Sequence, residues 1–112
     1  MKVPVHKMVG DGCMTCKDGE RLQREFREEF DRGDTVELDF DNTRIYVTAF
    51  FNAAVASLLE NYSRDELKRR LKIVNLPSAA KELLDDSLDN ADRYYHDPNF
   101  RKALGRVLGN LA

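Results

Sequence analysis

Residues 18–40 read DGERLQREFREEFDRGDTVELDF, and the change of pattern within this stretch decides the fold. Its first part carries a large apolar residue at every fourth position, at Leu22, Phe26 and Phe30. This spacing places the three on one side of a helix, which we expect over residues 18–32, with Gly33 ending it. Residues 35–40 then alternate between apolar and polar, a pattern typical of a half-buried strand. A helix followed directly by a strand indicates the α/β class.

The remaining sequence continues this alternation of strands and helices. Pro4 cannot donate a ladder hydrogen bond, so the first strand belongs at a sheet edge. The other predicted elements, in chain order, are a strand over residues 2–9, a short strand over residues 45–47, a helix over residues 48–62, a short helix over residues 63–70, a strand over residues 72–75, a helix from Pro77 and a last helix from Pro98. We therefore expect a single domain over residues 1–112, with an α/β fold in which helices pack on a small mixed or mostly parallel sheet of about four strands.

The composition is that of a well-charged chain that is close to neutral overall. Its 112 residues include 18 basic and 20 acidic side chains, which gives a net charge of -2. A nucleic-acid-binding protein normally concentrates Lys and Arg on one face and is strongly basic, so we expect no nucleic-acid partner. The sequence has no apolar stretch of the ~18 residues that a membrane span needs, and its start lacks the pattern of a signal peptide. We expect a cytoplasmic protein with no membrane partner.

Two cysteines stand close together in the segment Cys13-Met-Thr-Cys16, just before the first predicted helix. A thiol near a helix start can become nucleophilic, so one hypothesis is a redox pair or half of a metal site. A structural zinc normally needs four ligands, however, and beyond these cysteines the chain offers His6, His96 and carboxylates. The other hypothesis is that both are incidental loop cysteines, with no standing disulfide in a reducing compartment.

Known catalytic motifs do not assemble into a site in this sequence. It has no glycine-rich phosphate loop, no zinc-protease motif and no nucleophile elbow. His6 and His96 are far apart in the chain, and no serine pairs convincingly with either. Because covalent catalysis needs a nucleophile beside a base, we expect a binding protein rather than an enzyme, and we expect no cofactor.

Four segments together resemble a known family. In order and spacing they are similar to STAS-like domains of bacteria, which are distant relatives of anti-sigma-factor antagonists. The segments are Asp18-Gly-Glu-Arg-Leu22, Val36-Glu-Leu-Asp-Phe40, Thr48-Ala-Phe-Phe51 and Leu71-Lys-Ile-Val-Asn-Leu76. The resemblance covers roughly residues 18–95, and it implies a STAS-like fold and a regulatory, protein-binding role in signalling.

The resemblance also points to a site at the start of the helix predicted from Thr48. In the antagonists, a partner kinase phosphorylates a serine at this position, and the aspartate before it corresponds to Val47 here. The resemblance therefore implies Thr48 as a possible phosphoacceptor, although Val47 and Phe50 depart from the family pattern. It further implies that a protein partner, possibly a histidine-kinase-like ATPase, binds around Asn42, Val47, Thr48 and Phe51. From the residues alone, Thr48 is expected to cap the helix that it precedes.

Overall fold

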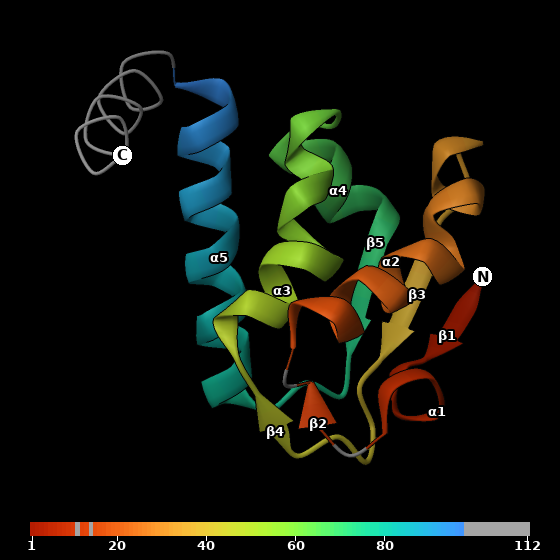
Figure 1. Cartoon of the computed structure of the whole chain (residues 1–112). Helices are drawn as coiled ribbons and strands as arrows, with labels where there is room; N and C mark the ends of the chain where they lie inside the picture. Colours follow the sequence, from red (N-terminus) through yellow and green to blue (C-terminus); the bar gives the residue numbers. More distant parts are fainter. Residues whose placement is uncertain (11, 14, 98–112) are drawn as a thin grey trace.

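Three parallel strands form the main sheet of the fold (Figure 1). They are β1 (Lys2–Pro4), β3 (Val36–Asp39) and β5 (Leu71–Val74), arranged in the order β1-β3-β5 with β3 in the centre. A second parallel pair consists of β2 (Gly12–Cys13) and β4 (Ile45–Tyr46). The predicted α/β class and parallel sheet are confirmed, but the strands divide into sets of three and two.

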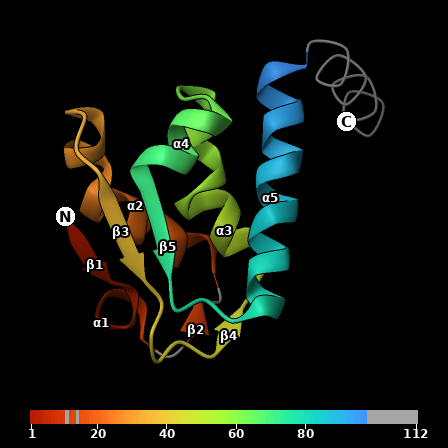
Figure 2. The ribbon, with the colours of Figure 1, turned by 180° about the vertical axis from the view of Figure 1, so that it is seen from behind.

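The helices cover one face of the main sheet. They are α1 (Val5–Val9), α2 (Cys16–Asp31), α3 (Thr48–Ala54), the 3-10 helix η1 (Ala56–Glu60), α4 (Arg64–Arg70) and α5 (Ser78–His96). Figure 2, seen from behind, shows the sheet in front of α2 and α3. The uncovered face is polar, and on it Lys2 Nζ lies 3.5 Å from Glu37 Oε2. This computed structural model describes residues 1–97 except 11 and 14, and only the backbone of residues 12 and 13.

The core lies between this sheet and the helices. The α2 stripe predicted from the sequence is confirmed, because Leu22, Phe26 and Phe30 are all fully buried. Two alternate residues of β3, Val36 and Leu38, face them from the sheet and are buried as well. Gly33 has a positive φ of 101° just beyond the helix, a conformation that glycine adopts without strain. The helix begins before residue 18, at Cys16, since the Thr15 hydroxyl accepts the N–H of Asp18 at 3.0 Å.

The closest approach within the core is the crossing of α2 over α3. A Cβ atom added to Gly19 would lie 2.4 Å from the carbonyl oxygen of Phe50 and 2.9 Å from the Cβ of Ala53. The two helix backbones therefore touch at a point where only hydrogen fits. Beside this point, the Gln23 side-chain amide donates hydrogen bonds to the carbonyl oxygens of Ala53 and Ala54, at 3.1 and 3.2 Å.

The Gln23 contact explains why the predicted helix over residues 48–62 is interrupted. The carbonyl groups of Ala53 and Ala54 lie at the end of α3, where Val55 leaves helical geometry with φ -126° and ψ -53°. Carbonyl groups at a helix end need partners from outside the helix, and here Gln23 supplies them. The chain continues as η1, and Val55, Leu58 and Leu59 are buried there.

The predicted strand over residues 2–9 is wrong beyond Pro4. Strand β1 lies at the sheet edge, as Pro4 requires, but the next five residues form α1. Val5 is fully buried and Val9 is half-buried four residues later, which fits a helical turn as well as it fits the apolar pattern of a strand. Gly10, with φ 79°, ends the turn by donating its N–H to the His6 carbonyl.

The remaining predicted elements are confirmed to within one residue at their starts. The Ser63 hydroxyl caps α4 by accepting the N–H of Glu66 at 3.1 Å. Strand β5 begins at Leu71, and Pro77 precedes the first residue of α5 instead of being that residue. The last predicted helix, from Pro98, lies outside the described residues. None of the helices in the described ranges is long and apolar enough to cross a membrane.

We expect Gly19→Ala to destabilise the protein. The added methyl group must displace the Phe50 carbonyl, and overpacking of this kind costs about 1–3 kcal/mol, whereas the gain in helix propensity is at most about 1 kcal/mol. Urea unfolding followed by circular dichroism measures the difference. Arg24→Ala, at an exposed position of the same helix, is the control and should change the free energy of unfolding little. An alanine variant at position 19 that is more stable than wild type would contradict the proposed backbone contact.

Candidate functional site

The candidate site lies at the end of the molecule where the parallel strands finish. β4 and the start of α3 are found there, close to β2 (Figure 1). In open α/β sheets, binding sites commonly form beyond the carboxyl ends of the strands. Of the predicted site residues, Val47 and Thr48 lie between β4 and the first turn of α3, and Asn42 lies in the turn that precedes β4.

A tight turn leads from β3 toward the site. The N–H of Thr43 donates to the Phe40 carbonyl at 3.1 Å, which closes a four-residue turn around Asp41 and Asn42. Asn42 is exposed and has a φ of 68°, a left-handed conformation that asparagine tolerates better than most residues. Asn42 therefore lies in a turn and presents its side chain to solvent.

Beneath the start of α3 lies a cluster of aromatic rings. Tyr46 and Phe51 are stacked with ring centroids 6.1 Å apart, and Phe50 meets Phe51 edge to face at 5.5 Å. Phe40, from the end of β3, contacts all three. The Tyr46 hydroxyl also donates to the carbonyl of Thr43 at 3.1 Å, so the cluster joins the turn to the helix start. Together these contacts hold the surface above them in one position.

Phe51 belongs to this cluster and not to the surface. The sequence predicts it as a partner contact, but the structure buries its side chain completely. Its neighbour Phe50 is buried as well, because both pack between α2 and the sheet end. Phe51 supports the site from below, and a partner at the surface would meet Val47, which is half-buried, and Thr48, which is exposed.

Thr48 is the first residue of α3 and not its cap. Val47 occupies the cap position with extended backbone angles, and its carbonyl accepts the N–H of Phe50 at 3.2 Å. The prediction of a capping threonine is thus wrong by one residue. The Thr48 hydroxyl is exposed and forms no hydrogen bond with the described part of the chain. It remains available to a ligand or a modifying enzyme.

The two cysteines of the alternative hypothesis lie next to this site. Cys13 in β2 is paired with Tyr46 in β4, two residues before Thr48, although its side chain is outside the described part. Cys16 is exposed at the first position of α2, and its Sγ lies 3.7 Å from Oε1 of Glu20. Within the described residues, no group of three or more His, Cys, Asp and Glu side chains is placed to hold a metal ion.

The two histidines considered as further ligands lie on different elements. His6 lies in α1, and His96 ends α5 with its Nε2 3.9 Å from Asp92 Oδ1. The structure thus places the predicted thiol segment beside the α3 start and does not assemble a four-ligand zinc site from the described side chains.

Hydrogen bonds to the Asp39 carboxylate lie at the carboxyl end of the main sheet. The side-chain amide of Asn75 donates to Asp39 Oδ1 at 2.8 Å, and the Asp41 N–H donates to the same oxygen at 3.0 Å. These hydrogen bonds, first that of Asn75, lower the pKa of Asp39 below its ordinary value because they favour the ionised carboxylate. They fasten the end of β3 to the end of β5 and fix the base of the turn that carries Asn42.

The chain was compared with known families and proteins. The sequence profile of a family described as a STAS-like domain of unknown function (DUF4325) matches residues 18–81, more than half of the chain. The chain belongs to this family. Neither a curated protein nor a solved structure matches it. The part of the STAS-like domain that the family shares runs from α2 to the first turn of α5, and it includes both Gly19 and Thr48.

The contacts that hold the candidate site in place were not predicted from the sequence. Gly19 and Gln23 lie in the first predicted helix, yet they determine where α3 runs and where it ends. An isolated glycine in a helical pattern usually has a packing reason, so Gly19 did carry a signal. The pairing of β2 with β4 had none, because a two-residue strand is too short for an apolar alternation.

We expect Asn75→Gly to raise the pKa of Asp39 toward its ordinary value. Glycine keeps the left-handed backbone that Asn75 adopts, with φ 59°, and removes only the amide donor. A carboxyl whose folded pKa is lowered stabilises the fold above its unfolded pKa and loses this effect as the pH falls through the folded pKa. The variant should lose stability relative to wild type at neutral pH and approach it in acid. Carbon-detected NMR titration of Asp39 measures the shift; an unchanged pKa would contradict the assigned cause.

Proposed function

We propose that this STAS-like domain is a regulatory module that binds a protein partner through the start of α3. The contact surface, called here the α3 docking surface, consists of Asn42, Val47 and Thr48. The observation that carries the proposal is the hydroxyl of Thr48. It is exposed, forms no hydrogen bond with the described part of the chain, and lies above the packed aromatic cluster. We infer binding and not catalysis as its activity.

The partner that we propose is a histidine-kinase-like ATPase, as the family resemblance implies. Such a partner could also phosphorylate Thr48. A phosphate there would stand in the first turn of α3, where unpaired N–H groups and the helix dipole favour negative charge. The free hydroxyl of Thr48 supports this role, and the identity of the partner rests on the resemblance.

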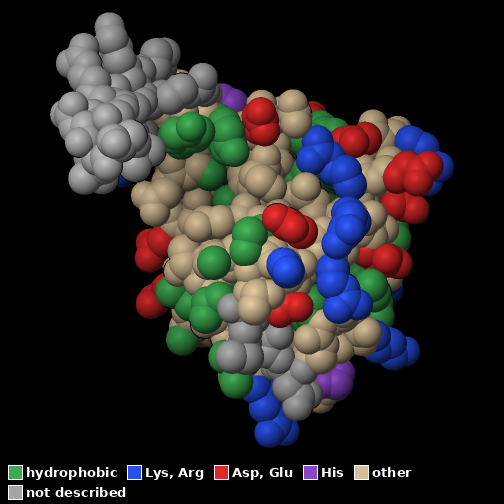
Figure 3. Space-filling model, viewed as in Figure 1, with side chains coloured by type: hydrophobic (Ala, Val, Ile, Leu, Met, Phe, Trp, Pro, Cys, Tyr) green, Lys and Arg blue, Asp and Glu red, His purple; other side chains and the backbone are tan. Residues whose placement is uncertain are grey.

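The neighbouring face of α2 supports a polar contact beside the apolar Val47. Figure 3 shows Lys and Arg side chains gathered over α2 on the side of the molecule that also presents α3. The exposed basic residues at the start of this helix are Lys17, Arg21 and Arg24. None of the three forms an ion pair with a described residue, so they are available to acidic groups of a partner. Charges of this kind speed association and fix orientation.

The second candidate function is thiol redox or metal binding through Cys13 and Cys16. It is favoured by one observation, the exposure of Cys16 at the first position of α2, where a reagent can reach it. A single metal site would need ligands beyond these two, from the partner or from residues outside the described ranges. The docking proposal accounts for more of the surface and is the one that we favour.

We expect Thr48→Asp to separate folding from partner binding. An acidic residue in the first helical turn interacts favourably with the helix dipole, by about 0.3–1 kcal/mol, so the variant should melt at or slightly above the wild-type temperature. The same charge must be desolvated inside the contact, which should weaken binding at least tenfold.

A photo-crosslinking amino acid at the exposed Ala49 measures this binding in cells that naturally make the protein. The wild-type background should yield a crosslinked histidine-kinase-like ATPase, and Thr48→Asp should lose it. Lys72→Asp, on the uncovered sheet face, is the control and should keep the product. A crosslinked product that Thr48→Asp leaves unchanged would refute the proposed surface. A product that contains no histidine-kinase-like ATPase would refute the proposed partner.

We expect the double variant Cys13→Ser, Cys16→Ser to retain fold and partner binding. Cys16 is exposed, and a substitution at an exposed position away from buried features usually changes stability by at most about 0.5 kcal/mol. Thermal unfolding, metal analysis of the purified protein and the crosslinking yield from Ala49 test this outcome. A bound metal in stoichiometric amount that the double variant lacks, or a fall in melting temperature on reduction of the wild type, would favour the thiol function instead.

A further inference from the structure

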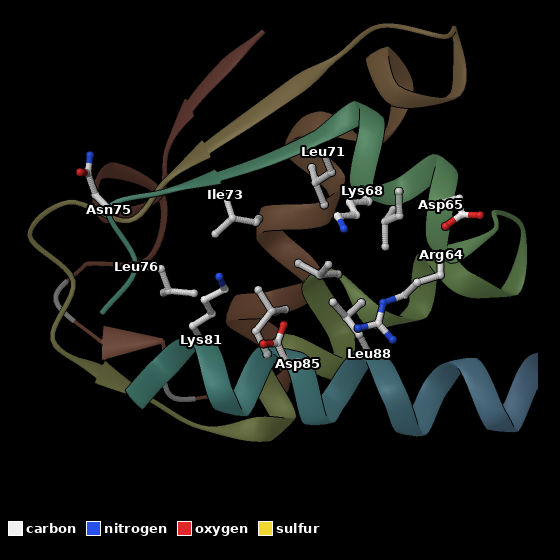
Figure 4. Close-up of a pocket in the computed structure, with 13 residues that line it drawn as sticks. Arg64, Asp65, Lys68, Leu71, Ile73, Asn75, Leu76, Lys81, Asp85 and Leu88 are labelled. Atoms are coloured by element: carbon white, nitrogen blue, oxygen red, sulfur yellow. The ribbon is translucent and has the colours of Figure 1, made fainter. Parts of the chain in front are cut away.

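A groove of about 670 Å³ lies between β5 and α5 (Figure 4). Side chains from β5, α4 and α5 and from the loop after β5 line it, and most of them are apolar. The apolar lining consists of Val55, Leu67, Leu71, Ile73, Leu76, Leu84 and Leu88. Charged residues stand around it, among them Lys68, Lys81 and Asp85. None of the residues that line the groove belongs to the α3 docking surface.

The edge of β5 beside this groove presents unpaired backbone groups. β5 pairs with β3 on one side, and within the described ranges no strand pairs with its other side. The Val74 carbonyl accepts the N–H of Phe40 at 3.0 Å, so it points toward β3. Backbone groups alternate in direction along a strand, and Ile73 therefore turns its N–H and carbonyl toward the free edge. Another extended chain is the natural partner of such an edge.

The helix layer reaches further than the sheet on this side of the molecule. α5 packs against α3 and η1, and Figure 2 shows it beyond β5, on the side away from β1 and β3. Neighbouring strands lie ~4.8 Å apart, whereas a helix with its side chains is ~10 Å wide. α5 therefore supports the position of one more strand next to β5. The groove is that position, with Leu84 and Leu88 on its floor.

The charges in the groove favour an acidic occupant. Figure 4 shows the amino groups of Lys68 and Lys81 reaching toward the groove, while Asp65 lies at its outer end. Neither lysine forms an ion pair with a described residue. Asp85 is the carboxylate near the middle, so the two ammonium groups leave an excess of positive charge. Carboxylates of a bound chain would pair with them.

We propose that this groove binds an extended strand of a protein partner, which adds to the sheet beside β5. Its backbone would pair with Ile73, and its side chains at alternate positions would enter the groove, where apolar ones would meet Leu84 and Leu88 and acidic ones would face Lys68 and Lys81. In recognition of this kind, main-chain hydrogen bonds give affinity and the pockets for alternate side chains give specificity.

Two other occupants fit the groove less well. A second copy of the chain, paired through its own β5, would bring a second α5 into the same part of the helix layer. Residues 98–112 of this chain contain Arg101, Lys102 and Arg106 and no acidic side chain. Their positive charge would be repelled by the two lysines. A strand from an acidic partner meets neither obstacle.

A display library of random twelve-residue peptides, selected on the full chain, tests the proposal. We expect selected sequences to carry both apolar and acidic residues at every second position, because side chains at these positions share the face toward the groove. A synthetic peptide of that sequence should bind at least tenfold more weakly to the variant Lys68→Glu, Lys81→Glu, by fluorescence anisotropy. Lys72→Glu, a lysine on the uncovered sheet face, is the matched control and should bind as wild type does. In hydrogen exchange, the Ile73 amide should exchange quickly in the free protein and be protected by the peptide.

Each contrary outcome overturns the proposal in a recognisable way. Selected peptides that bind the doubly reversed variant as tightly as wild type, peptides that are basic, or a selection that yields no binder would exclude an acidic strand. Protection of the Ile73 amide without peptide would show that the edge is already covered. If that protection grows with protein concentration the occupant is a second copy, and if it does not the occupant is a segment of the same chain.

Discussion

The rest of the structure depends on the backbone contact between α2 and α3 at Gly19. Because no side chain separates the helices there, the Phe50 carbonyl approaches α2 closely and Gln23 reaches the end of α3. This contact fixes three things together: the depth of the aromatic cluster, the end of α3 at Ala54 and the position of Thr48 at its start. A larger side chain in place of Gly19 would displace the aromatic cluster and both ends of α3.

The sequence was informative where a pattern was long and local. The α2 stripe and the β3 alternation span several repeats, so their elements and buried faces were predicted correctly. Predictions failed where tertiary contacts decide the geometry. Val5 satisfies a strand pattern and a helical turn equally, and only its packing selects the helix. The break after Ala54 depends on Gln23, about thirty residues earlier in the chain, which no local pattern in the α3 sequence can reveal.

The exposure of the candidate site residues was predicted only in part. Asn42 and Thr48, which the family resemblance implies as partner contacts, both lie at the surface. Phe51 could not be assigned from the sequence, because a helix that is apolar on nearly every side gives no indication of which ring faces outward. Because Phe51 is buried, the surface consists of Asn42, Val47 and Thr48, and the aromatic rings pack beneath it.

The short ladder between β2 and β4 has a mechanical consequence. It joins the cysteine segment to the residues that lead into α3, through the pairs Gly12 with Ile45 and Cys13 with Tyr46. Tyr46 in turn stacks on Phe51 inside the core. A displacement of the cysteine segment would therefore also displace the residues that lead into α3. The thiol chemistry and the partner binding proposed above would then be coupled through this pair of strands.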